Sequence, residues 1–220
     1  RAELGIDYLK LVHGEQGLTV HRPLAAAAAV VGESRVVRIV DKGEGRGAVL
    51  HVEKQLRDAA DGALLATTEQ VLFLRGDGGF SRGTGADAPA EAGAPMPETA
   101  PDAVLDLPTR PEAALVYRLS GDLNPLHADP AVAARAGFPA PILHGLATWG
   151  MAGRALIHAF CEDDPARLRT LRARLTAPVY PGETLRFEVW RKGPGEVAFR
   201  ARVPARDALV LNHGSAEWVA

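Results

Sequence analysis

The sequence predicts an α+β protein in which two sets of antiparallel strands follow one another along the chain, the second set wrapping around one long helix. Three observations indicate this class. Both halves contain short apolar or alternating runs at the spacing of hairpins. A stretch rich in Gly, Ala and Pro separates the halves, and residues 144–160 carry apolar side chains at helical spacing. We therefore expect a duplicated fold.

The first half is predicted to consist of strands. Each run ends at turn residues, such as Lys42 and Gly43. The alanine-rich run 24–31 is short and is followed by Gly32, so we expect a loop that leads into a strand. No pattern comparable to the long helix occurs in this half. The expected strands cover residues 10–22, 36–43, 47–58 and 63–76.

A linker is expected over residues 81–111. This stretch is rich in Gly, Ala and Pro, whose backbone entropy and missing donors disfavour regular structure. The sequence thereby predicts two domains, over residues 1–80 and 112–220.

The second half is expected to begin with a strand over residues 113–120. A short helix over residues 129–137 follows. Asp129 is suited to be its N-cap, Pro130 occupies the first helical position, and Gly137 ends it.

The long helix over residues 144–160 contains Gly145, Gly150 and Gly153. Glycine is costly in a helix interior. We therefore expect a sheet or a ligand to pack very close to this helix. The remaining strands are expected over residues 169–176, 184–191, 195–204 and 208–219.

Composition excludes several classes of protein. The net charge of −2 over 220 residues argues against a nucleic-acid partner. The single cysteine, Cys161, rules out a disulfide within the chain and a cysteine-based zinc site, and it fits a reducing, cytoplasmic setting. No apolar run approaches the roughly 20 residues of a membrane span, and no signal peptide is visible. Because the chain starts at Arg1 without a methionine, we expect an N-terminal piece to be absent.

The most polar stretch lies just after the strand expected at 113–120. Asp122, Asn124 and His127 fall within six residues of one short loop, in which Gly121 permits an unusual backbone angle and Pro125 fixes the chain after Asn124. A carboxylate and a neutral imidazole this close together can grip one water molecule. The carboxylate accepts its proton, and the imidazole orients it or exchanges a second proton. Adding water to an activated double bond needs this arrangement.

A second requirement is a donor for the negative charge that builds on a carbonyl oxygen. Gly145 follows His144 where the long helix begins. Its backbone N–H, supported by the helix dipole, suits that oxygen. Each feature alone also fits an ordinary turn or helix start, so the prediction of an active site rests on their combination.

These segments resemble the MaoC-like hydratases, and more narrowly the two-domain (R)-specific 2-enoyl-CoA hydratases called hydratase 2. The match covers most of the chain. The segments are YRLSGDLNPLHADPAVAARAGFPAPILHGL (117–146), VYPGETL (179–185), LVHGEQ (11–16), VDKGEGRGA (40–48) and FLRGDGGF (73–80).

The resemblance implies a double hotdog, in which two antiparallel sheets each wrap a helix, with the N-terminal hotdog incomplete in this chain. It implies reversible syn addition of water to trans-2-enoyl-CoA. The first half would accommodate the acyl chain and carry no catalytic loop. No metal is expected and no cofactor is needed, because coenzyme A is part of the substrate.

The resemblance also assigns residues. Asp122 and His127 would activate water, Asn124 would hold the substrate or this pair, and Gly145 would donate to the oxyanion. Further residues are expected to bind the substrate. These are His13, Gly14, Lys42, Pro125, Leu126 and Leu175.

Two of these residues have simpler alternatives. Lys42 suits a CoA phosphate but equally a solvated turn, and without the resemblance His13 fits an ordinary strand histidine.

Three hypotheses for the whole chain stay open: a hydro-lyase, a hotdog acyl-CoA thioesterase, and a non-catalytic acyl-CoA-binding subunit of a heteromer. The expected partner is an acyl-CoA thioester, with no nucleic acid, no membrane and a possible homodimer.

Overall fold

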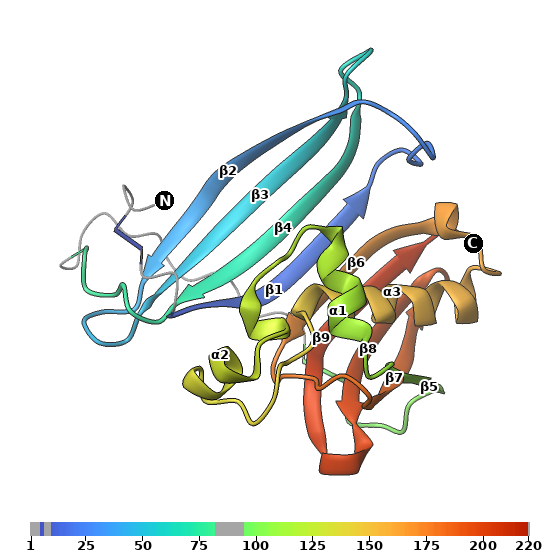
Figure 1. Cartoon of the computed structure of the whole chain (residues 1–220). Helices are drawn as coiled ribbons and strands as arrows, with labels where there is room; N and C mark the ends of the chain where they lie inside the picture. Colours follow the sequence, from blue (N-terminus) through green and yellow to red (C-terminus); the bar gives the residue numbers. More distant parts are fainter. Residues whose placement is uncertain (1–4, 7–9, 82–94, 220) are drawn as a thin grey trace. The chain divides into compact units, whose positions relative to one another are not determined.

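The computed structural model describes residues 5, 6, 10–81 and 95–219. The chain divides into two compact units, residues 1–94 and 95–220, which we describe one at a time (Figure 1).

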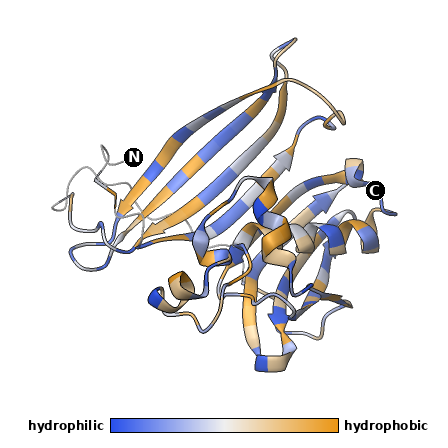
Figure 2. Ribbon diagram, viewed as in Figure 1, coloured by the Kyte–Doolittle hydropathy of each residue, from blue (hydrophilic) through white to orange (hydrophobic). Residues whose placement is uncertain are grey.

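The described part of the first unit is an antiparallel sheet of four strands in the order β2-β3-β4-β1. It contains no α-helix within residues 10–81, and the run 24–29 is a loop that leads into a strand, as expected. Hydrophilic and hydrophobic residues alternate along its strands (Figure 2). The strands are β1 (Leu11–Val20), β2 (Val30–Asp41), β3 (Ala48–Asp58) and β4 (Leu64–Leu74).

One carboxylate fastens two loops of this unit. Asp41, the last residue of β2, accepts hydrogen bonds from the backbone N–H groups of Gly43, Gly79 and Ser81 at 2.7 to 2.8 Å. The Ser81 hydroxyl donates a further one at 2.7 Å. Together these donors, led by the Gly79 N–H, hold the pKa of Asp41 far below its usual range.

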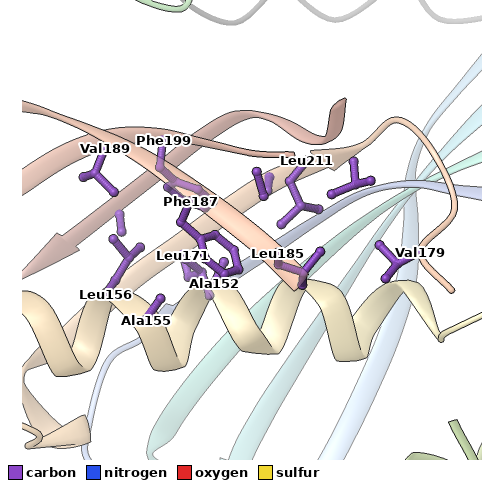
Figure 3. Packing of buried hydrophobic residues seen from close by; sticks show 14 of the residues in the cluster. Ala152, Ala155, Leu156, Leu171, Val179, Leu185, Phe187, Val189, Phe199 and Leu211 are labelled. Carbon is purple, nitrogen blue, oxygen red and sulfur yellow. The ribbon is translucent and has the colours of Figure 1, made fainter. Parts of the chain in front are cut away.

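The second unit is an antiparallel sheet of five strands in the order β6-β9-β8-β7-β5, with the helix α3 (Gly145–Phe160) packed against it. Figure 3 shows buried side chains, among them Phe187, Phe199 and Leu156, filling the space between helix and sheet. The strands are β5 (Ala103–Pro108), β6 (Leu168–Leu175), β7 (Thr184–Gly193), β8 (Glu196–Val203) and β9 (Ala208–Trp218).

Two of the three helix glycines lie where the sheet approaches α3 closely. A Cβ on Gly153 would lie 3.0 Å from a methyl carbon of Leu171, and one on Gly145 would lie 2.8 Å from a methyl carbon of Leu175. A Cβ on Gly150 would meet nothing within 4 Å. Close packing of the sheet is therefore confirmed at Gly145 and Gly153, and the sheet does not approach Gly150.

The short helix is confirmed as α2 (Pro130–Arg135). The Asp129 carboxylate accepts hydrogen bonds from the N–H groups of Ala131 and Val132, and Gly137 follows with a φ of 86°. Among the residues that the structure describes, no helix has the length and apolar character needed to cross a membrane.

Two predictions around the linker are wrong. Residues 113–120, expected to be a strand, form helix α1 (Ala113–Tyr117) and the 3-10 turn η3 (Arg118–Ser120). Residues 103–108, expected to be linker, form strand β5, which pairs with β7. The apolar run at 113–120 is so short that its periodicity fits a helix as well as a strand. In addition, β5 already occupies the sheet edge beside β7. The linker residues 82–94 lie outside the described residues.

Candidate active site

The polar loop begins where α1 and η3 end. Gly121 follows η3 with a φ of 110°, a left-handed conformation that glycine adopts without the strain of a side chain. The chain turns there and presents Asp122 as the first polar residue of the loop.

Hydrogen bonds within the loop hold Asp122 and Asn124. Oδ1 of Asp122 accepts from the backbone N–H of Asn124 at 3.2 Å. Oδ1 of Asn124 accepts from the N–H of Leu126 at 3.1 Å and thereby caps the 3-10 turn η4 (Pro125–His127). The Asp122 side chain is 54% exposed, so its carboxylate is open to water and substrate.

His127 is buried, with 9% of its surface exposed, and its ring orientation is fixed. Its Nδ1 lies 2.8 Å from the main-chain oxygen of Ile142. A carbonyl oxygen can only accept, so Nδ1 carries the hydrogen. In the neutral ring Nε2 then presents a lone pair, which is the state that receives a proton.

His144 lies directly against this pair, although the sequence analysis gave it no role. Its side chain is 2% exposed, and its Nε2 lies 3.2 Å from the main-chain oxygen of Asp122 and 4.0 Å from that residue's Oδ2. Its ring stacks on the His127 ring with centroids 3.7 Å apart. Burial lowers the pKa of His144, and the neighbouring His127 lowers it further. These two effects favour the neutral form of the His144 imidazole.

Tyr117 and Ile142 also contact the histidines of this loop, and the sequence did not predict either contact. The Tyr117 ring lies 4.7 Å from that of His144, centroid to centroid. Burial raises the pKa of the Tyr117 phenol, and the charge of Asp122 adds to the shift, so the hydroxyl stays protonated at neutral pH. Tyr117 falls inside the quoted motif, but nothing local shows that it meets His144. Ile142 makes its contact through the main-chain oxygen, so the identity of its side chain could not predict it.

Gly145 is the first residue of α3, so its N–H has no acceptor within the helix. The helix dipole adds positive character at this end. Leu175, from the end of β6, packs its methyl groups where a Gly145 side chain would lie. Gly145 and Leu175, expected at the site for different reasons, are thus in contact.

The cluster also has the composition of a metal site. Side-chain ligand atoms of Asp122, His127 and His144 all lie within 4.8 Å of one another. However, Nε2 of His144 donates its hydrogen to the Asp122 main-chain oxygen, and a nitrogen that donates has no lone pair for a metal. Ligation would require this bond to break and the proton to move to the buried Nδ1, which has no partner.

The other predicted substrate-binding residues lie in the first unit. Nε2 of His13 donates a hydrogen bond to the main-chain oxygen of Glu15 at 2.9 Å, and burial lowers the pKa of the His13 imidazole. The register of β1 shifts at Gly14. Lys42 is exposed, with Nζ 5.4 Å from the centroid of the Phe73 ring. Their presence at the same site as Asp122 stays a prediction.

Two family models match this chain. The model of the MaoC like domain matches residues 93–210, more than half of the chain. The chain belongs to the MaoC-like dehydratase family. The model of the MFE-2 hydratase 2 N-terminal domain matches residues 2–76 of this MaoC-like chain. The resemblance stated from the sequence is confirmed.

Named relatives of the MaoC-like chain include dehydratases and hydratases. It is 46% identical over 215 residues to 3-hydroxyacyl-thioester dehydratase Y of Mycobacterium tuberculosis, covering 96% of this chain and 73% of the relative. It is 39% identical over 207 residues to the peroxisomal enoyl-CoA hydratase 2 of Arabidopsis thaliana, covering 91% and 66%. It is 35% identical to the peroxisomal multifunctional enzyme type 2 of Mus musculus, covering 98% of this chain but only 29% of that protein.

Solved structures agree with the hotdog fold. A MaoC-like dehydratase from Phytophthora capsici superposes with a TM-score of 0.89 at 36% identity, covering 97% of this chain and 73% of that one. A conserved protein of Mycobacterium tuberculosis described as having a double hotdog fold gives a TM-score of 0.56 at 20% identity, covering 96% and 77%. The expectation of a hotdog fold is confirmed, and the described residues show the central helix in the second unit.

Proposed function

We propose that this MaoC-like chain is an (R)-specific enoyl-CoA hydratase, a hydro-lyase that adds water reversibly to trans-2-enoyl-CoA and gives (R)-3-hydroxyacyl-CoA. One observation carries the proposal. The exposed carboxylate of Asp122 and the fixed imidazole of His127 come from one loop, and His144, which touches both, is followed by the free helix-start N–H of Gly145.

In the proposed reaction, one water molecule is held between the Asp122 carboxylate and the Nε2 lone pair of His127. The carboxylate takes a proton while the water oxygen bonds to the β carbon of the substrate. Electrons move to the thioester oxygen, whose charge the Gly145 N–H stabilises. The carboxylate then returns the proton to the α carbon. Because both additions come from one face, the product is the syn adduct.

The first test is Asp122→Asn. The amide cannot take the proton, so we expect hydration to fall by roughly 10²- to 10⁴-fold, measured as loss of the enoyl-thioester absorbance. The control is Asp129→Asn, which changes a nearby carboxylate to an equally good N-cap and should leave the rate unchanged. Turnover retained by a folded Asp122→Asn protein would refute the proposal.

The two alternatives give different products in the same samples. A thioesterase would release free CoA thiol while the enoyl group persists. A binding subunit would hold enoyl-CoA without turnover. A chiral dehydrogenase that consumes only (R)-3-hydroxyacyl-CoA tests the stereochemistry of the hydratase product.

The substrate would extend beyond the catalytic loop. We propose that Asn124, Pro125, Leu126 and Leu175 contact the thioester end. In the first unit, His13, Gly14 and Lys42 would contact the rest of the acyl-CoA. The proposed chemistry needs no cofactor.

Assembly and location stay predictions. A homodimer is one possibility that the sequence leaves open. A cytoplasmic location is the second such prediction, and two of the relatives are named as peroxisomal proteins.

A further inference from the structure

His144 lies against both Asp122 and His127, yet the proposed reaction gives it no step. It binds the main chain of Asp122, stacks on His127, and immediately precedes Gly145 in the chain. As the N-cap of α3 it could cap its own helix, but its side chain makes no cap hydrogen bond. The imidazole is turned to the loop instead.

The hydrogen bond to Asp122 determines which nitrogen of the neutral His144 ring carries the hydrogen. The main-chain oxygen only accepts, so Nε2 carries the hydrogen and Nδ1 a lone pair. That Nδ1 is buried without a hydrogen-bond partner. An unsatisfied polar atom in a buried position is unfavourable, and an apolar ring of similar shape would avoid it. Packing alone therefore does not account for a histidine at this position.

The stacked ring limits the motion of His127. With centroids 3.7 Å apart and planes tilted by 26°, the two imidazoles are in face contact. The Ile142 bond fixes one edge of the His127 ring, and His144 covers one face. The direction of the His127 Nε2 lone pair is thereby set from two sides.

We propose that His144 is a positioning residue of the hydration site. It holds the Asp122 main chain and the His127 ring at a fixed separation and ties both to the first turn of α3, where the Gly145 N–H lies. The inference rests on the proposed function, because it concerns the geometry of that reaction.

Three variants separate the two contacts. His144→Phe keeps a ring against His127 but loses the donor to Asp122. His144→Gln keeps a donor of similar reach but loses the ring, and His144→Ala loses both. Leu156→Ala, buried elsewhere on α3, is the control for lost packing.

The expected readout is a split between kcat and KM. Misplacement of reacting groups by about 1 Å can cost roughly 10²-fold in rate, so we expect a fall in kcat of about that size for His144→Ala, with KM within about threefold. His144→Gln and His144→Phe should each recover part of it. Leu156→Ala should lower the melting temperature without changing kcat per folded molecule. If kcat of His144→Ala matches that of wild type, or follows the folded fraction alone, the inference is overturned.

A measurement without turnover separates this inference from the proposed function. Nitrogen-15 NMR of the imidazoles reports which ring nitrogen carries the hydrogen. Wild type should show His127 in the Nδ1–H form and His144 in the Nε2–H form. In His144→Ala, the His127 ring loses its stacking partner and should turn away from the Ile142 oxygen for part of the time, so its signal should move toward a mixture of tautomers. An unchanged His127 signal would overturn the positioning role, whereas wild-type protein inactive on every enoyl-CoA would overturn the proposed function alone.

Discussion

A methyl carbon of Leu175 occupies the space that a side chain on Gly145 would need, since a Cβ there would lie only 2.8 Å away. The φ of Gly145 does not lie in the left-handed region, so the restriction at this position comes from space. Gly145, the proposed oxyanion donor, and Leu175, a proposed substrate contact, can therefore lie this close only because Gly145 has no side chain.

Gly145→Ala should lower kcat by roughly tenfold or more, because the N–H must move as the new methyl group and Leu175 separate. The second substitution Leu175→Ala in the same protein should restore part of the rate. Gly150→Ala is the matched control, because its Cβ has open space. It should keep the rate and raise stability by about 1 kcal/mol. Full activity of Gly145→Ala would argue against the Gly145 N–H as the donor.

His127→Ala should reduce kcat by about 10²- to 10⁴-fold through loss of the group that orients the water. Circular dichroism and thermal unfolding should show a folded protein. His158→Ala serves as the control, because His158 is an exposed histidine of the same unit that pairs with Asp163. Equal rates for the two variants would remove His127 from the mechanism.

Lys42→Ala should raise the KM for an enoyl-CoA several-fold at low salt if the ammonium meets a CoA phosphate. The KM for an enoyl-pantetheine substrate, which lacks the nucleotide phosphates, should not change. Lys192→Ala removes another exposed lysine and should affect neither substrate. If KM is insensitive to Lys42→Ala with both substrates, Lys42 is a solvated turn lysine.

Asp41→Asn should destabilise the protein at pH 7. In wild type, N–H and O–H donors surround both carboxylate oxygens, and the NH₂ group of asparagine would face some of these donors with hydrogens of its own. The pKa of Asp41 is lowered from 3.8 in the folded protein, so its stabilising effect is present above about pH 5. The effect is lost as the pH falls through the unfolded value toward the lower folded one. Thermal unfolding of wild type and variant should therefore converge in acid.

The control for this pH dependence is Glu44→Gln, which neutralises an exposed carboxylate in the loop beside Asp41. It should leave the pH dependence of unfolding unchanged. A constant gap between wild type and Asp41→Asn from pH 7 to pH 3 would contradict the assignment.

Local patterns predicted most of the elements. Apart from β5, the strands of both units and helix α3 follow the periodicity of their side chains, and the cap of α2 follows from Asp129 and Pro130. The loop of Asp122, Asn124 and His127 could be found because its chemistry lies within six residues.

The failures depend on contacts between distant residues. Strand β5 exists because Leu105 and its neighbours pair with β7 around Phe187, about 80 positions later. The stack of His144 on His127 joins residues on opposite sides of α2. No pattern within a short window encodes either contact.

The short loop that holds Asp122 and His127 has a consequence for how the chain tolerates change. The separation of these two side chains is set by a few bonds within the loop and by two anchors, the Ile142 oxygen and the His144 ring. In the proposed hydratase, substitutions along the acyl path can therefore alter which substrate fits while leaving the proposed bond-making step intact. Chemistry and selectivity are separable properties in such a chain, and new specificities can be selected or engineered without rebuilding the reaction.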